Sequence, residues 1–160
     1  MEFEYALQVY LKQKDINDIP ILYKDSVNLL LSRDFSKLLS WLKRKKWNEI
    51  KVNRNNFEQS GLPFKNSILD YDVVSVIRLI QARDGLKEAL DAGLITNENA
   101  NITWTTQDNS SIVLSYSDLK TIPFLALDYI DSLHKKSRKY RNIIENATNI
   151  EDVIGVVWEK

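Results

Sequence analysis

The chain has 160 residues, with 22 Lys and Arg balanced by 22 Asp and Glu. This length suits one ordinary domain or two small ones, and zero net charge means that any electrostatic partner must bind a local patch. The chain has no cysteine, which excludes disulfides and thiolate metal sites, and no apolar run approaches the about 20 residues that cross a bilayer.

The first segment, MEFEYALQVYLK, fits two secondary structures. Apolar side chains alternate from Phe3 to Leu11 as in a strand, and a subset of them also lies at helical spacing. The aromatic residues and Val9 favour the strand slightly. The segment lacks the positive end and the cleavage site of a signal peptide, so we expect synthesis in the cytosol. Residues Asp15–Pro20 are typical of a turn.

A helix is predicted from Asp34 onward, because apolar residues follow at helical spacing and Asp34 can accept hydrogen bonds from the free amides of the first turn. Further on, Arg54–Ser67 gathers Asn, Gly, Pro and Ser and is the best candidate for a linker or a domain boundary. We therefore divide the chain into an unfamiliar N-terminal region, residues 1–66, which we assign to partner attachment, and a C-terminal domain, residues 67–160.

Asp70 or Asp72 can begin the next helix, which we expect to run to about Ala92. Gly93 stands where a left-handed residue commonly ends a helix, and Gly85 inside the helix permits a bend or break. The side that we expect to be buried is marked by Val73, Val76, Ile77, Ile80, Leu86, Ala89 and Leu90.

The stretch ITWTTQDNSSIVLSYSDL, residues 102–119, changes its apolar period from two to a helical spacing. Two alternating segments around the polar stretch Gln107–Ser111 predict a β-hairpin over about residues 102–116. For Trp104 and Leu114 to share a face, the loop must contain an odd number of residues, either three or the five of Gln107–Ser111. The residues expected in the hairpin core are Ile102, Trp104, Ile112, Leu114 and Tyr116.

A long helix is predicted over about residues 118–147, with Ser117 as its cap and Pro123 in its early turns. Its apolar seam either closes an intramolecular core, which we favour, or packs against copies of the same chain with exposed Tyr129 and Tyr140 as anchors. The seam has a nearly heptad spacing and comprises Leu119, Ile122, Ala126, Tyr129, Leu133, Tyr140, Ile144 and Ala147.

Thr148 and Glu151 have the spacing of a capping box, which predicts a short last helix carrying Ile150 and Val153. Taken together, the segments predict an α+β, mainly helical protein in which the hairpin packs on the long helix.

Three features after Tyr71 occur in a distinctive order: a helix start at Asp72–Arg78, the hairpin with its Trp followed by Asp-Asn, and the ending LHKKSRKYRNIIENATNIEDV. In this order they resemble a domain of unassigned function that recurs in tailed phages and prophages, commonly within tail-fibre and tail-assembly proteins. The resemblance covers residues 71–160. This chain departs from that family in a more basic long helix that is poorer in alanine, which leaves the identity of its packing partners open.

The resemblance implies a non-enzymatic tail-associated structural or assembly protein, either a fibre-linked adaptor or a chaperone for the fibre. Its partners would be other phage tail proteins, with a homo-oligomer also open, and its location the virion tail or the host cytoplasm during assembly. The family supplies no catalytic residues to carry over.

Two basic segments are the best candidates for partner binding. The first, Trp41–Trp47, combines cations with two aromatic rings. The second spans Lys135–Arg141. We expect solvated helix surface most, then a protein partner, then nucleic acid; Trp41 at helical spacing suits the core better than base stacking. The alternative function is a small phage-encoded module that binds a host protein or nucleic acid through this first segment. The candidate partner-binding residues are Trp41, Lys43, Arg44, Lys45, Lys46, Trp47, Tyr129 and Tyr140.

Signals for catalysis are weak. His134 has neither a second histidine nor a cysteine to converge with, which favours a structural histidine over a ligand or base. Two pairs of carboxylates, Asp70 with Asp72 and Asp128 with Asp131, could in principle serve acid–base chemistry or bind a cation. The first pair flanks a predicted helix start, where negative charge is stabilising for structural reasons, and we expect catalysis from neither pair. We therefore predict no catalytic residue, cofactor or metal.

Overall fold

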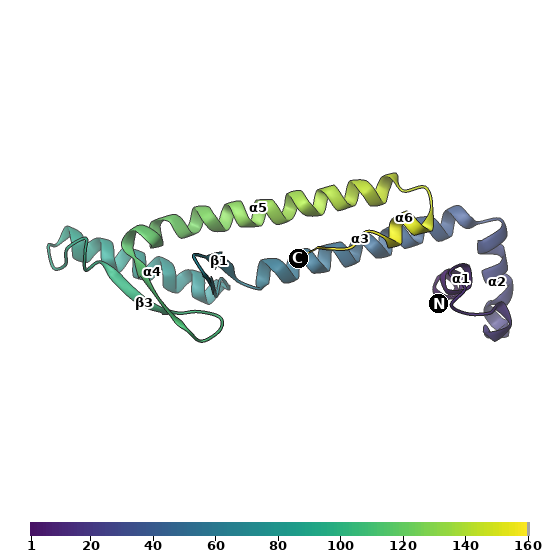
Figure 1. Cartoon of the computed structure of the whole chain (residues 1–160), viewed down its shortest axis with the longest axis horizontal. Helices are drawn as coiled ribbons and strands as arrows, with labels where there is room; N and C mark the ends of the chain where they lie inside the picture. Colours follow the sequence, from purple (N-terminus) through teal and green to yellow (C-terminus); the bar gives the residue numbers. More distant parts are fainter. Residues whose placement is uncertain (160) are drawn as a thin grey trace. The chain divides into compact units, whose positions relative to one another are not determined.

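The computed structural model describes residues 1–159, and it contains six α-helices, one short 3₁₀ helix and two antiparallel two-stranded sheets (Figure 1). This arrangement confirms the expected α+β, mainly helical class. The chain forms two compact units. We call Met1–Val52 with the chain from Arg138 onward the terminal unit, and Asn53–Ser137 the central unit. Helices α3 (Phe35–Gln59) and α5 (Tyr116–Asn146) contribute residues to both units.

The first segment is a helix, α1 (Glu2–Tyr10), so the slightly favoured strand is wrong. Aromatic side chains of this helix contact partners on two other helices, α2 (Ile21–Ser32) and α3. The ring of Phe3 stacks on that of Trp41 at 5.5 Å between centroids, and Tyr5 packs against Tyr23 at 5.4 Å. Ala6 on the same helix is fully buried.

The rest of the terminal unit is built from η1 (Ile16–Asp18), α2 (Ile21–Ser32), parts of α3 and α5, and α6 (Ile150–Ile154). Its core joins the start and the end of the chain. The buried members are Ala6, Ile19, Val27, Leu30, Leu38, Leu42, Ala147, Ile150 and Val153.

The last helix begins as expected, but its cap is Asn149 rather than Thr148. The Asn149 side chain accepts a hydrogen bond from the Asp152 amide at 2.7 Å and donates one to the Asp152 carboxylate at 2.7 Å. The reciprocal capping pattern therefore lies one residue later than the Thr148–Glu151 spacing suggested.

The expected linker, Arg54–Ser67, is ordered structure instead. Its first residues continue α3 to Gln59, and the remainder forms the ribbon of β1 (Leu62–Phe64) and β2 (Ser67–Leu69). Gly61 stands between α3 and β1 and has a positive φ of 97°, a backbone conformation that favours glycine. This residue of the stretch therefore serves a turn and not a flexible linker.

Helix α4 (Val73–Asp91) begins and ends as predicted. The Asp72 carboxylate accepts hydrogen bonds from the amides of Val74 and Ser75 at 2.8 and 3.0 Å. Hydrogen bonds to the ionised form outweigh the small opposing effect of burial and lower the pKa of Asp72. Gly93 adopts a φ of 68° just after the helix, and no break occurs at Gly85.

The buried side of α4 differs in part from the expected one, although Leu86 packs on the core as predicted. Ser75 and Leu79 are buried, whereas Val73, Ile77 and Ile80 are 77%, 49% and 41% exposed. The core of the central unit contacts the side of the helix that carries Leu79, Ala82 and Leu86, and the denser row of β-branched residues is left on the surface. Counting apolar residues at helical spacing could not distinguish these two sides, because both carry them.

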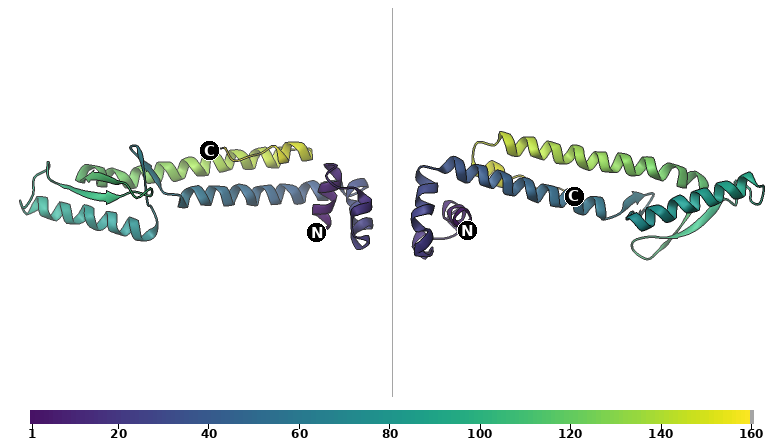
Figure 2. Two further views of the ribbon diagram at one scale, coloured as in Figure 1. Left: turned by 60° about the horizontal axis from the view of Figure 1, so that its bottom comes forward. Right: turned by 180° about the vertical axis from the view of Figure 1, so that it is seen from behind.

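The hairpin of β3 (Asn101–Thr105) and β4 (Ser111–Ser115) has the predicted register. Trp104 pairs with Ile112 and Ile102 with Leu114, so all four side chains share one face. Five residues separate the strands, which confirms the odd loop, although the loop is Thr106–Ser110 and begins one residue earlier than expected. The ribbon lies alongside α4 in all views (Figures 1 and 2).

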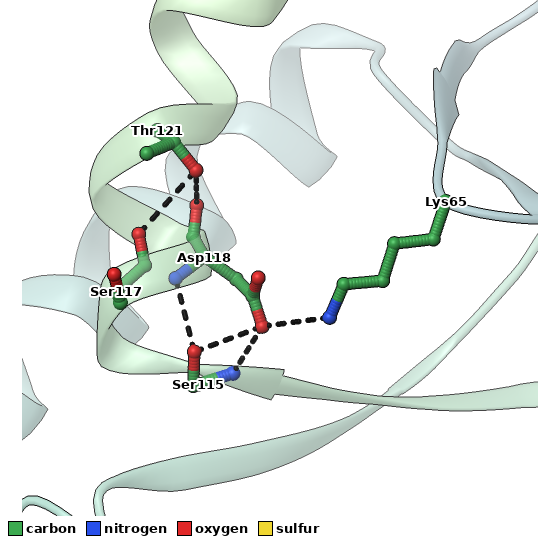
Figure 3. Close-up of polar contacts among 5 residues, drawn as sticks. All are labelled: Lys65, Ser115, Ser117, Asp118 and Thr121. Carbon is green, nitrogen blue, oxygen red and sulfur yellow. Dashed lines mark hydrogen bonds and ion pairs between the residues drawn. The ribbon is translucent and has the colours of Figure 1, made fainter.

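Helix α5 starts at Tyr116, which therefore belongs to the helix and not to the hairpin. Its cap is Ser115 rather than Ser117. The Ser115 hydroxyl accepts a hydrogen bond from the Asp118 amide at 3.1 Å, and the Asp118 carboxylate accepts from the Ser115 amide and hydroxyl at 2.9 Å each (Figure 3). The Lys65 ammonium approaches the same carboxylate oxygen at 3.0 Å. This capping box ties the β1–β2 turn to the start of α5.

Seven of the eight predicted seam residues of α5 are buried, and the eighth, Tyr129, is partly buried against the core of the central unit. The apolar seam of α5 is thus buried by other residues of the same chain, which is the alternative that we favoured. None of the helices in residues 1–159 is both long and apolar enough to span a membrane. The buried core of the central unit comprises Leu62, Phe64, Leu69, Leu79, Leu114, Leu119, Ile122 and Ala126.

Candidate partner-binding cleft

The two basic segments of the sequence meet at one cavity in the terminal unit. Its volume is about 230 Å³. We call it the basic–aromatic cleft; it is lined by Lys43, Arg44 and Trp47 of α3 and by Arg141, Ile144 and Glu145 of α5.

Trp47 is the aromatic wall of this cleft and carries two cations. The guanidinium of Arg141 lies 5.4 Å from the centre of its ring, and the Lys51 ammonium lies 5.8 Å away. Both distances allow a cation–π attraction. Arg141 also forms an ion pair with Glu145, with 2.7 Å between Nε and Oε1. The orientation of Arg141 over the ring is therefore fixed from two sides.

The two cations contributed by α3 have different roles. The Lys43 ammonium donates a hydrogen bond to the backbone carbonyl of Glu145 at 2.9 Å, in the last turn of α5. Such carbonyls lack helical donors, so Lys43 stabilises the end of this helix. Arg44 is exposed and forms no ion pair within residues 1–159. It also lines a second cavity of about 300 Å³ with Phe3 and Ser40. Arg44 is thus the cation of this cleft that is available to an anionic group.

Other residues of the first basic segment point into the fold or into local pairs. Trp41 stacks on Phe3 within the core of the terminal unit, as expected for its helical position. Lys45 lies over the Trp41 ring at 4.9 Å and 3.6 Å from a carboxylate oxygen of Glu4. Burial raises the pKa of Glu4, but its hydrogen bonds and the nearby positive charges outweigh that effect and lower it overall. Lys46 pairs with Glu49 at 2.9 Å.

The two tyrosines that were candidate interface anchors have intramolecular partners. The Tyr129 hydroxyl donates to the Phe57 carbonyl at 3.4 Å. Tyr140 is buried beside Trp158, with 5.6 Å between ring centroids, and its hydroxyl accepts a hydrogen bond from the Glu159 amide. Neither ring is an exposed anchor.

His134 lies in a charged cluster of the central unit. Its Nε2 is 3.1 Å from Oε1 of Glu58, and Nε of Arg54 is 3.2 Å from the same oxygen. Within residues 1–159 no three potential metal ligands of the His, Cys, Asp or Glu type converge.

Sequence reasoning identified both basic segments but not their juxtaposition. Trp47 and Arg141 are far apart along the chain, and no spacing or motif in either segment signals that they meet. Only the packing of the end of α5 against α3 in the terminal unit brings them together.

Comparison with known proteins gives one result. The family model described as Domain of unknown function (DUF4376) matches residues 42–156. The match confirms a domain of unassigned function, which begins at residue 42 and includes every residue of the basic–aromatic cleft. No curated protein and no solved structure matches the chain.

Proposed function

We propose that this chain, which belongs to the family described as Domain of unknown function (DUF4376), is a non-enzymatic structural or assembly protein of a phage or prophage tail. In this role it is a fibre-linked adaptor or a chaperone that assists fibre folding, in the virion tail or in the host cytoplasm during assembly. The support for a tail role is the order of features after Tyr71, which resembles domains of tail-fibre and tail-assembly proteins.

The observation that carries a role in protein–protein contact is the basic–aromatic cleft. Tryptophan and arginine are the residue types most enriched among those that dominate binding energy at protein interfaces. Trp47 and Ile144 provide apolar surface, and Arg44 provides a guanidinium that has no counter-ion among residues 1–159. A partner segment with an apolar side chain next to a carboxylate complements this arrangement.

Co-purification tests the proposal. The full chain is co-expressed with the tail proteins encoded beside it and analysed by size-exclusion chromatography. We expect a stoichiometric complex with one of them. Arg44→Glu should weaken that complex at least tenfold, which corresponds to about 1.4 kcal/mol. Lys139→Glu is the matched control, because Lys139 is exposed on α5 and does not line the cleft. The proposal is overturned if no complex forms with any neighbouring tail protein.

The second candidate function uses the same cleft for a host protein or a nucleic acid. It is favoured by the cations that surround Trp47, because cations beside an aromatic ring suit a phosphate backbone and a stacked base. Binding of single-stranded nucleic acid would fall steeply with salt concentration and would also be lost in Arg44→Glu. Tight, salt-sensitive binding without a tail-protein complex would replace the first proposal with this one.

A further inference from the structure

An apolar surface in the central unit remains uncovered after its core is complete. Helix α4 and the first half of α5 line a pocket of about 200 Å³, with Val76 and Ile80 on one side and Ile122 and Pro123 on the other. From this pocket apolar side chains continue outward along both helices. We call this surface the α4–α5 face; its large exposed residues are Val73, Val74, Ile77, Ile80, Phe124, Leu127 and Ile130.

The spacing of these residues makes the face continuous. On α4, Val73, Ile77 and Ile80 follow at steps of four and three residues, which places them along one stripe of a helix. On α5, Leu127 follows Pro123 by four residues and precedes Ile130 by three. The two stripes flank the same pocket, so they form one apolar groove between the two helices.

The size of the face matches one side of a stable interface. Phe124 is 71% exposed, Leu127 65% and Val73 77%. If a fully exposed side chain of this kind presents roughly 150–200 Å², the exposed fractions of the seven residues amount to about 700 Å². A standard protein interface buries about 800 Å² on each partner, and a monomer rarely exposes an apolar patch above about 600 Å².

The two edges of the face carry opposite charges, so the face is complementary to a second copy of itself. Arg78 borders the apolar stripe of α4, and Asp128 borders that of α5; both are exposed, and neither has an ion pair within residues 1–159. A two-fold axis through the groove places α4 of one copy on α5 of the other. It thereby turns Arg78 of each copy toward the edge where the second copy carries Asp128. The zero net charge of the chain adds no repulsion between copies.

We propose that the α4–α5 face binds a second copy of this chain, forming a two-fold dimer in which four helices enclose a shared apolar core. This surface is separate from the basic–aromatic cleft, so the dimer does not depend on the proposed tail function. Of the buried seam of α5, Leu119 and Ile122 reach this surface at the wall of the pocket.

Sedimentation velocity of the full chain from about 1 to 200 µM tests the dimer. We expect wild type to dimerise with a micromolar Kd. Leu127→Asp should raise that Kd at least tenfold while circular dichroism stays unchanged, because the Leu127 side chain is largely exposed. The control is Val52→Asp on α3, where a 56% exposed valine lies outside the face, and its Kd should equal that of wild type.

A charge exchange tests the orientation. Arg78→Asp and Asp128→Arg should each weaken the homodimer, and an equimolar mixture of the two variants should form a heterodimer in which both contacts pair opposite charges. A wild-type monomer across the whole concentration range overturns the proposal and leaves the face to another protein. Equal weakening by Val52→Asp, or a mixture no tighter than its components, overturns it as well.

Discussion

Replacing Asp118 with alanine should destabilise the protein measurably, although the residue lies at no binding surface. Its carboxylate accepts hydrogen bonds from the Ser115 amide and hydroxyl and pairs with Lys65, and its side chain is only 20% exposed (Figure 3). Loss of a helix cap typically costs about 0.5–2 kcal/mol, and a hydrogen bond to a charged group contributes about 1.5–3 kcal/mol. Because the contact with Lys65 is half exposed, we expect about 1–2 kcal/mol in total for Asp118→Ala.

For a chain of this length, each kcal/mol shifts Tm by about 2–4 °C, so the variant should melt about 2–8 °C below wild type. Urea unfolding followed by circular dichroism gives the free energy directly. Asp25→Ala is the control, because Asp25 is an exposed carboxylate on α2 without an ion pair in the described chain, and it should change Tm little.

The same contacts predict a pH dependence. Burial raises the pKa of Asp118, but the hydrogen bonds from Ser115 and the charge of Lys65 outweigh it, so the folded-state pKa is lowered. A lowered pKa means that the stabilisation is complete above the unfolded value of about 3.9 and is lost as pH falls through the folded-state value. The difference between wild type and Asp118→Asn should therefore be largest near neutral pH and shrink below about pH 4. An Asp118→Ala variant as stable as wild type, or a difference from Asp118→Asn that is independent of pH, would refute this reasoning.

Three further predictions concern backbone and turn geometry. Gly61→Ala should destabilise the protein by more than about 2 kcal/mol, because the new Cβ would lie 2.6 Å from the Leu69 carbonyl oxygen at a φ of 97°. Gly85→Ala, where the Cβ meets no atom within 4 Å, should stabilise it by about 1 kcal/mol, and changes of the same sign in the free energy of urea unfolding would contradict this pair of predictions. In an NMR titration the pKa of Asp108 should be about 2, because the Thr106 hydroxyl donates to its carboxylate at 2.6 Å, and Thr106→Val should raise it; an unchanged pKa would exclude this cause. Asn109→Gly should stabilise by a few tenths of a kcal/mol, because Asn109 has a φ of 62°, and a loss of stability would show that its side chain matters.

The hairpin and α4 could be predicted because their signals are local. The register of Trp104 against Ile112 follows from the period of two and the odd loop, and the start of α4 follows from the Asp72 side chain that satisfies its first amides. Such features depend on residues within a few positions of one another.

The errors of one or two residues in the caps of α5 and α6 are local, whereas the larger failures involve partners that are distant in sequence. The residue types of the first segment slightly favoured a strand, whereas contacts with distant residues, such as that of Phe3 with Trp41, accompany the helix that forms. The buried side of α4 is chosen by the hairpin and by α5, and the surplus of β-branched residues on its other side suggested the opposite. For the same reason the basic–aromatic cleft was seen only as two separate basic segments, since no pattern in α3 refers to Arg141.

The core of the terminal unit has a consequence for biosynthesis. Its earlier members end at Leu42, and Ala147, Ile150 and Val153 follow more than a hundred positions later along the chain. A ribosome adding about 5–20 residues per second needs roughly 5–20 s to produce that intervening stretch. Throughout this interval the nascent helices α1 and α2 expose the apolar side chains that α6 later covers. The central unit, whose residues are contiguous, can fold first, and the first part of the chain to be made is among the last to reach its native packing.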